Sequence, residues 1–492
     1  MELLKNGSGG SGLSLLGRAM GNFSTASSWR RRGGVAIIAT SLAVVSSHAS
    51  ATTLYEAIKI ALEANPEIGQ AIANREAIEF ELRQAKGLWL PQLDFEGRAG
   101  AQNYESPNLA TTGGQGGTLP RREANLVLQQ LLFDGFNRRG EVEKQAARVD
   151  GASNRVYERS EFIGLAIVRE FLEIGRLYEV VAYNEENVAY HRKTVGQLKV
   201  AGEEGALAVT DNQQAQERVY AAEARLIAAR QELNAARIHF NQLVGKPFDS
   251  YVPPPSIAGF VPGTLAEAIG AARQYSPLVH VAQADLDSVY ALKKQAASGF
   301  YPKVGVEVRG RVGEDLEGVE GLVTDFRAEL VVRWNLYKGG IDTANWQEQI
   351  RRIDEARYAL DKAFRDIEEA VRLAWNAREQ EQQRLAQLEQ QLAATNKLVD
   401  AYTEQFKVGE RSLLDLLDTQ NTHVNAQIEV VTATYTVLFA DYRLLAAAGR
   451  LLYSLHITPP KQSYGYARNL VNFPGSLEGD TQKRRSLPFA PD

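Results

Sequence analysis

The sequence of 492 residues contains no cysteine, which excludes a disulfide framework and a lipid-anchored N-terminal cysteine. It also contains no HExxH zinc motif and no GxSxG nucleophile motif, and its six histidines are scattered without metal-ligand spacing. The formal net charge of −5 gives no electrostatic basis for binding nucleic acid. We therefore expect a protein that is not an enzyme, that uses no metal or cofactor and that has no nucleic-acid partner.

Long apolar runs are missing as well. The run from Val35 to Val45 has 11 residues, fewer than the roughly 20 that a helix needs to cross a bilayer. It follows the arginines Arg30–Arg32 and precedes small residues at 49–51, so residues 1–51 are predicted to be a signal peptide. Since no other segment could form a spanning helix, insertion into a membrane would have to use strands.

What the sequence does contain is one pattern repeated twice. The motif LYEAI at 54–58 returns as LAEAI at 265–269, and LFDG at 132–135 returns as LYKG at 336–339. Each repeat is predicted to form a helix, two strands, a long helix, a turn and a further helix. The expected divisions are a first repeat at 52–245, a linker at 246–263, a second repeat at 264–453 and an irregular C-terminal tail at 454–492.

Alternation of apolar and polar residues predicts the strands. Ala328 and Leu330 share one face of such a stretch, while Arg327 and Glu329 share the other. The four expected strands are 92–102, 122–133, 303–312 and 326–337. Four strands cannot close a barrel, and an open sheet edge in lipid leaves backbone groups unpaired. Twelve strands from three chains leave room for a channel, so the pattern predicts a homotrimer.

A long helix is predicted from about Ile341 to Phe406, which would span roughly 100 Å at about 1.5 Å per residue. In its last third, apolar residues recur with the three-four spacing of a heptad, as at Leu385, Leu388 and Leu392. This spacing is typical of helices that pack against other helices in a coiled coil.

Two turns at the ends of the long helices contain the candidate functional residues. Gly205 precedes Asp211 by six positions, and Gly409 precedes Asp415 by the same interval. We predict that these turns meet at the narrow end of a tube, with Asp415 and Asp418 facing its bore. An alternative is that Asp415 only stabilises a helix start, because the stretch from Ser412 to Asp415 has the spacing of a capping box.

Taken together, these features resemble the TolC-like outer-membrane efflux and type I secretion channels. The resemblance covers about residues 53–452 and rests on the two LxEAIxxAxxxxP openings, the LFDG and LYKG junctions, AVTD at 208–211 and VGER…DLLD at 408–418. It implies an α+β membrane protein of Gram-negative bacteria. In this architecture a homotrimer forms a twelve-stranded β-barrel in outer-membrane lipid, continuous with an α-helical tunnel through the periplasm.

The resemblance also implies roles for particular residues. Asp415 and Asp418 fall on the pair that lines the constriction, and Arg411 falls on a latch arginine whose partners would be Thr210 and Asp211. Phe406 stands where the family has a latch tyrosine, and it offers no hydroxyl.

The implied function is a passive exit duct that is gated at its periplasmic end. It would be opened by a periplasmic adaptor protein and an inner-membrane transporter of the ABC or RND type. Small molecules and unfolded proteins both remain open as cargo. The alternative is a periplasmic helical structural or adaptor protein without a pore.

Overall fold

The computed structural model describes residues 53–105, 117–203, 209–317 and 320–471, without the side chains of residues 200–209. The predicted signal peptide and the turn glycine Gly205 therefore lie outside the described residues. Within the described ranges, no helix combines the length and the apolar character needed to cross a membrane.

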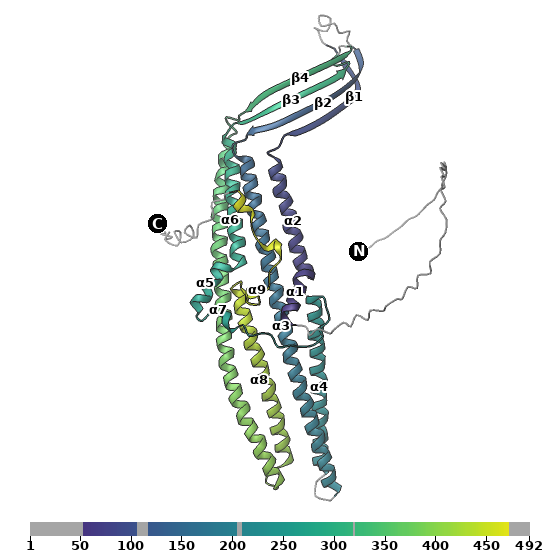
Figure 1. Ribbon diagram of the computed structural model, residues 1–492, viewed down its shortest axis with the longest axis vertical. Coiled ribbons are helices and arrows are strands. Elements are labelled where there is room, and N and C mark those ends of the chain that lie inside the picture. Colours follow the sequence, from purple (N-terminus) through teal and green to yellow (C-terminus); the bar gives the residue numbers. More distant parts are fainter. Residues whose placement is uncertain (1–52, 106–116, 204–208, 318–319, 472–492) are drawn as a thin grey trace, which may run out of the picture. The chain divides into compact units, whose positions relative to one another are not determined.

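The elements alternate long helices with pairs of strands (Figure 1). The first half contains α1 (Leu54–Ala64), α2 (Pro66–Gly87), β1 (Gln92–Tyr104), β2 (Gly117–Phe133), α3 (Asn137–Glu203) and α4 (Val209–Val244). The second half contains α5 (Leu265–Tyr275), α6 (Pro277–Ala297), β3 (Lys303–Glu314), β4 (Leu322–Arg333), α7 (Ile341–Lys407) and α8 (Leu413–Ala447). Two short helices follow, α9 (Leu451–Ser454) and α10 (Ala467–Leu470), and 3-10 turns lie at Ala258–Phe260, Ser298–Phe300 and Lys461–Ser463.

The opening helix of each half is divided in two. Thr53 and Glu56 form a capping box at the start of α1, with the Glu56 N–H donating to the Thr53 hydroxyl at 3.2 Å. The helix ends at Asn65, which adopts an extended conformation and caps α2, and Pro66 occupies the first position of α2. The residue before a proline is pushed out of the helical region, so the chain bends here.

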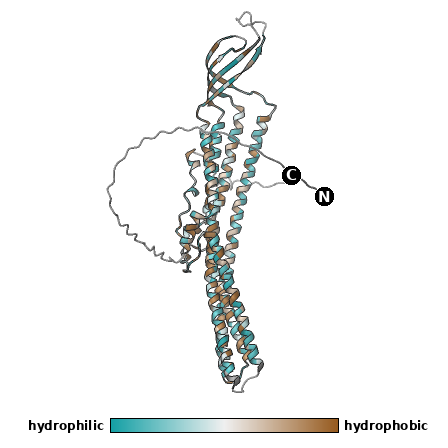
Figure 2. Ribbon diagram, turned by 90° about the vertical axis from the view of Figure 1, so that its right-hand side faces the viewer, coloured by the Kyte–Doolittle hydropathy of each residue, from teal (hydrophilic) through white to brown (hydrophobic). Residues whose placement is uncertain are grey.

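The four strands form one antiparallel sheet in the order β1-β2-β3-β4 (Figure 1). Hydrophobic and hydrophilic residues alternate along the strands (Figure 2). The register places Phe95 opposite Leu126 on one face and Arg98 opposite Glu123 on the other. The sheet thus has an apolar face and a charged face, as the alternation predicts.

The fourth strand differs from the expected 326–337, because it begins at Leu322 and ends at Arg333. Its apolar alternation continues to Trp334 and beyond, but the pairing stops. Arg333 pairs with Lys303, and the residue before Lys303 is Pro302, which has no N–H to donate. The second strand also begins earlier than expected, at Gly117, because β1 extends to Tyr104 and pairs with it there.

The helices share a core along α3, which packs against α2, α4, α6 and α8. The largest cluster of buried side chains joins α1, α3, α4 and the end of α8, and includes Ile58, Phe171, Phe240 and Tyr442. A second cluster joins α5, α6 and α7 with the end of α8, and includes Val279, Ile367 and Leu444. The long helices are thus stabilised by burial of apolar faces along their length.

The C-terminal tail was expected to be irregular from residue 454, but its described part, up to residue 471, contains a 3-10 turn and α10. Residues 472–492 lie outside the described residues. The carboxylate of Asp150 on α3 accepts hydrogen bonds from the backbone N–H groups of Tyr466, Ala467 and Arg468 at 2.8–3.2 Å. The Arg468 guanidinium pairs with Asp150 at 2.9 Å and with the buried Asp287 of α6 at 2.6 Å. The sequence shows no apolar period here because polar contacts hold this segment.

Candidate functional site

The α7–α8 turn lies at the end of the helices opposite the sheet (Figure 1). Helix α7 ends at Lys407, and Gly409 follows with a φ of 80°, a conformation that glycine adopts at little cost. Ser412 caps α8, and its hydroxyl accepts a hydrogen bond from the Asp415 N–H at 3.2 Å. Ser412 is therefore the cap, and the Asp415 carboxylate is 45% exposed in the first turn.

The corresponding residues of the first half lie at the start of α4. Thr210 is exposed, and Asp211 is half-buried in the first helical turn. A carboxylate at this position favours the positive end of the helix dipole.

The two helical hairpins, α3–α4 and α7–α8, meet in a small apolar cluster. Leu198 of α3 and Ala215 of α4 pack with Leu413 and Leu417 of α8. Phe406 packs against this cluster at the end of α7. A phenyl ring suits this environment better than a phenol would, since no buried hydroxyl needs a partner.

Arg411 contacts its own hairpin. Its Nε donates to Gln405 at 3.0 Å, its guanidinium lies 4.0 Å from Asp415, and it stacks over the Tyr402 ring at 4.4 Å. Among the described contacts of this one chain, none joins Arg411 to Thr210 or Asp211. The family motif did not indicate the contact between Arg411 and Tyr402.

Asp418 makes the ion pair that joins the two hairpins. Its carboxylate accepts from Arg218 of α4 at 2.8 Å, with the side chains 55% and 30% exposed. Sequence reasoning identified Asp418 but missed Arg218. The 204-residue repeat offset offers no signal for it, because the equivalent position in the second half is Thr422.

A buried histidine lies near Arg218 of this ion pair. His191 of α3 has a lowered pKa because burial disfavours its charged form, and the nearby cations Arg218 and Arg225 add to this effect. We therefore describe His191 as neutral at pH 7. The described residues contain no group of three or more His, Cys, Asp or Glu side chains arranged to hold a metal ion.

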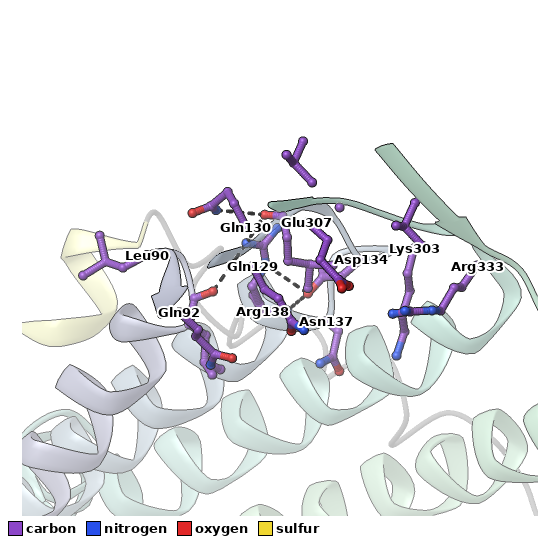
Figure 3. A pocket seen from close by; sticks show the side chains of 15 residues that line it. Leu90, Gln92, Gln129, Gln130, Asp134, Asn137, Arg138, Lys303, Glu307 and Arg333 are labelled. Atoms are coloured by element: carbon purple, nitrogen blue, oxygen red, sulfur yellow. Dashed lines mark hydrogen bonds and ion pairs between the residues drawn. The ribbon is translucent and has the colours of Figure 1, made fainter. Parts of the chain in front are cut away.

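A second polar site lies where the sheet meets the helices (Figure 3). A pocket of about 300 Å³ is lined by residues of both, among them Gln129, Lys303, Glu307 and Arg333. The buried Arg138 of α3 also lines this pocket, where it pairs with Asp134 at 3.1 Å and donates to the Leu131 carbonyl at 2.7 Å. This arginine fixes the end of β2 to the start of α3.

The profile of the family described as "Outer membrane efflux protein" matches residues 57–246 and 268–450. This chain belongs to that family. Its relatives include the outer membrane efflux protein BepC of Brucella suis, 24% identical over 417 residues that cover 85% of this chain and 89% of BepC. TolC of Escherichia coli is 22% identical over 440 residues, covering 84% and 86% of the two chains. The alkaline protease secretion protein AprF of Pseudomonas aeruginosa is 25% identical over 440 residues, covering 83% and 87%.

Solved structures share the fold. The Campylobacter jejuni CmeC outer membrane channel superimposes with a TM-score of 0.71 at 15% identity, covering 81% of this chain and 86% of CmeC. The outer membrane protein VceC of Vibrio cholerae gives 0.68 at 16% identity, covering 80% and 96%. As a member of the outer membrane efflux protein family, the chain is an export channel of the Gram-negative outer membrane that extends into the periplasm.

Proposed function

We propose that the chain is the exit duct of a tripartite export system, in which three copies form a twelve-stranded barrel and a helical tunnel. The observation that carries this proposal is a four-stranded sheet with a lipid-compatible face and two unpaired edges. On its apolar face Phe95, Phe326 and Leu330 are 73%, 75% and 66% exposed in the single chain. Such a face favours lipid contact, because in water it would be costly.

The two edge strands need further copies of the chain as pairing partners. Strands β1 and β4 each pair on one side only within the chain. In hydrocarbon each unpaired backbone group costs several kcal/mol, so the sheet has to close. Eight strands would nearly fill their own interior, whereas twelve begin to leave a lumen. The same exposed face argues against the alternative of a pore-less periplasmic adaptor.

The gate is proposed at the turns of the long helices. Three copies would bring six carboxylates, from Asp415 and Asp418, around a narrow bore. Arg218 would hold each α8 against α4 in the closed state, and Arg411 would reach Thr210 and Asp211 of a neighbouring copy. A periplasmic adaptor and an inner-membrane transporter of the ABC or RND type would release these contacts. The duct itself would conduct small molecules or unfolded proteins passively.

Planar-bilayer conductance of the purified protein tests this proposal. We expect small cation-selective currents, because crowded carboxylates attract cations. The double substitution Asp415→Ala with Asp418→Ala should reduce cation selectivity, whereas Glu429→Ala, an exposed carboxylate further along α8, should leave it unchanged. Arg411→Ser should enlarge the conductance if the latch exists. Unaltered selectivity in the double variant would remove the two aspartates from the bore, and absence of any current would contradict the duct.

A further inference from the structure

The two edge strands carry charged side chains that the chain itself leaves without partners. On the charged face of the inner strands, Arg311 pairs with Glu123 at 2.9 Å and Arg309 pairs with Glu307 at 2.8 Å. Asp94 on β1 and the residues Glu329 and Arg333 on β4 are exposed on that same face. In the described part of the chain, no ion pair or hydrogen bond involves these three side chains.

We infer that β4 of one copy pairs with β1 of the next in one register, which places Glu329 opposite Arg98 of the next copy and Arg333 opposite its Asp94. This inference rests on the trimeric barrel of the proposed function and specifies how that barrel closes.

The register within the chain fixes the starting point. A line across the sheet from Gln92 on β1 passes through Gln129 and Glu307 and reaches Glu329 on β4. In the next copy, Glu329 must face a residue on the charged side of β1, which begins with Gln92, Asp94, Glu96, Arg98 and Gly100. Facing Gln92 or Asp94 would tilt the strands by only about 0° or 20°, too little for a membrane barrel, which leaves the next three positions. A displacement by one residue would instead turn apolar side chains into the lumen.

The strand tilt of a membrane barrel excludes the register in which Glu329 faces Gly100. Facing Glu96, Arg98 or Gly100 displaces each copy by four, six or eight residues relative to the last. With a strand rise of about 3.4 Å and a strand spacing of about 4.8 Å, the strands of a twelve-stranded barrel would tilt by about 35°, 47° or 55°. Membrane barrels tilt by about 35–45°, so the first register lies at one end of this range, the second about 2° beyond the other end, and the third about 10° beyond it. The first two registers are therefore retained.

Cross-strand charge pairs distinguish the Glu96 register from the Arg98 register. The Glu96 register sets Glu329 opposite Glu96 and Arg327 opposite Arg98, which are two like-charge pairs. The Arg98 register sets Glu329 opposite Arg98 and Arg333 opposite Asp94, which are two opposite-charge pairs. Inside the chain β4 already faces like charges on β3, with Glu329 opposite Glu307 and Arg333 opposite Lys303. A further like charge on the other side of β4 would add to this repulsion, whereas an opposite charge would offset it, so the second register is favoured.

Disulfide crosslinking in isolated outer membranes tests this register, and the chain has no cysteine of its own to interfere. In the inferred register Ala328 faces Ala99 of the next copy on the apolar face. We expect Ala328→Cys with Ala99→Cys to form crosslinked oligomers on a non-reducing gel. The matched pairs are Ala328→Cys with Gly97→Cys or with Ala101→Cys, which would face each other in the two rejected registers. None of these substitutions removes a charge.

The geometry makes the readout specific. Directly opposite residues have Cβ atoms about 4.5–5.5 Å apart, near disulfide range, whereas diagonal neighbours are about 7–8 Å apart between Cα atoms. Within one chain, β1 and β4 are three strand spacings apart, about 14 Å, and residues 99 and 328 are further offset along the strands, so any crosslink joins two copies. Dominant crosslinking through position 97 or 101 would overturn the register while leaving the trimer intact.

The mass of the wild-type particle in detergent separates the two failures. A trimer without a 99–328 product refutes the register alone, and a monomer refutes the proposed function as well. As a second measurement, Asp94→Arg should lower the temperature at which the trimer dissociates in SDS, and adding Arg333→Asp should restore it. Adding Lys303→Asp instead should not, because Lys303 pairs with Arg333 inside the chain. Equal rescue by Arg333→Asp and by Lys303→Asp would also overturn the inferred register.

Discussion

Arg218 and Asp418 form the ion pair between the two helical hairpins, and both side chains are partly exposed. An exposed pair of this kind is worth only about 0–1 kcal/mol. That small energy suits the proposed gate, in which this contact would open when a partner protein binds. The apolar cluster of Leu198, Leu413 and Leu417 supplies the more permanent association of the hairpins.

Substitution of Arg218 by Ala is therefore expected to loosen the gate without unfolding the protein. Cells producing the variant should admit a large hydrophilic antibiotic that the intact outer membrane excludes, and growth inhibition measures this entry. Arg230→Ala is the matched control, since Arg230 pairs with Glu185 at 2.7 Å between α4 and α3 of the same hairpin. The exchanged pair Arg218→Asp with Asp418→Arg should restore exclusion, and failure to do so would contradict the role of the ion pair.

At this scale the sequence predicted residues where a motif repeats or where the family motif covers them. Asp415 follows Gly409 as Asp211 follows Gly205, so the turn could be located before its geometry was known. Arg218 could not, because its partner lies 200 residues away on another helix. The pairing depends on how two hairpins face each other, and a local pattern does not contain that information.

Among the elements, the best-predicted is one of the two 67-residue helices. Helix α7 was expected at Ile341 to Phe406 and spans Ile341–Lys407, because a heptad period over many turns is a strong signal. Strand β4 was displaced by four residues at each end, because alternation does not show where a partner strand begins. The short α9 and α10 carry no period and could not be predicted.

Helix α9 is stabilised by one buried carboxylate, which accepts hydrogen bonds from its first N–H groups. Glu161 of α3 accepts hydrogen bonds from the N–H groups of Leu451 and Leu452 at 3.0 and 3.1 Å. Burial raises the pKa of Glu161 to about 7, although these two hydrogen bonds act in the opposite direction. In the unfolded chain the same group titrates near its usual value of about 4.3.

This difference predicts a pH dependence of stability. Between about pH 4.3 and pH 7 the folded protein holds a proton at Glu161 that the unfolded chain has lost, so stability falls as the pH rises through this window. The unfolding temperature of the protein in detergent, followed by circular dichroism, should therefore fall from pH 5 to pH 7. Glu161→Gln should flatten this slope, whereas Glu186→Gln, at an exposed position, should not. Equal slopes in wild type and Glu161→Gln would refute this assignment.

For the whole molecule, the two faces of the sheet are expected to meet different surroundings. Leu330 lies on the apolar face and Val331 on the charged face of the same strand. Leu330→Arg should cost about 2–4 kcal/mol per chain if this position lies near the middle of the bilayer. The amount of folded protein in the outer-membrane fraction should then drop. Val331→Arg places the same side chain one residue away and should leave that amount unchanged; equal losses would contradict a lipid-facing apolar surface.

The contacts of Arg468 have a consequence for how the chain is completed. This one side chain is the cation shared by Asp150 of the first half and Asp287 of the second, and burial raises the pKa of Asp287. A chain that stopped before residue 468 would have to bury both acids without this counterion, which is strongly unfavourable. The segment around Arg468 thus joins the two halves of the fold, and a truncation before it is expected to make them more open to proteolysis.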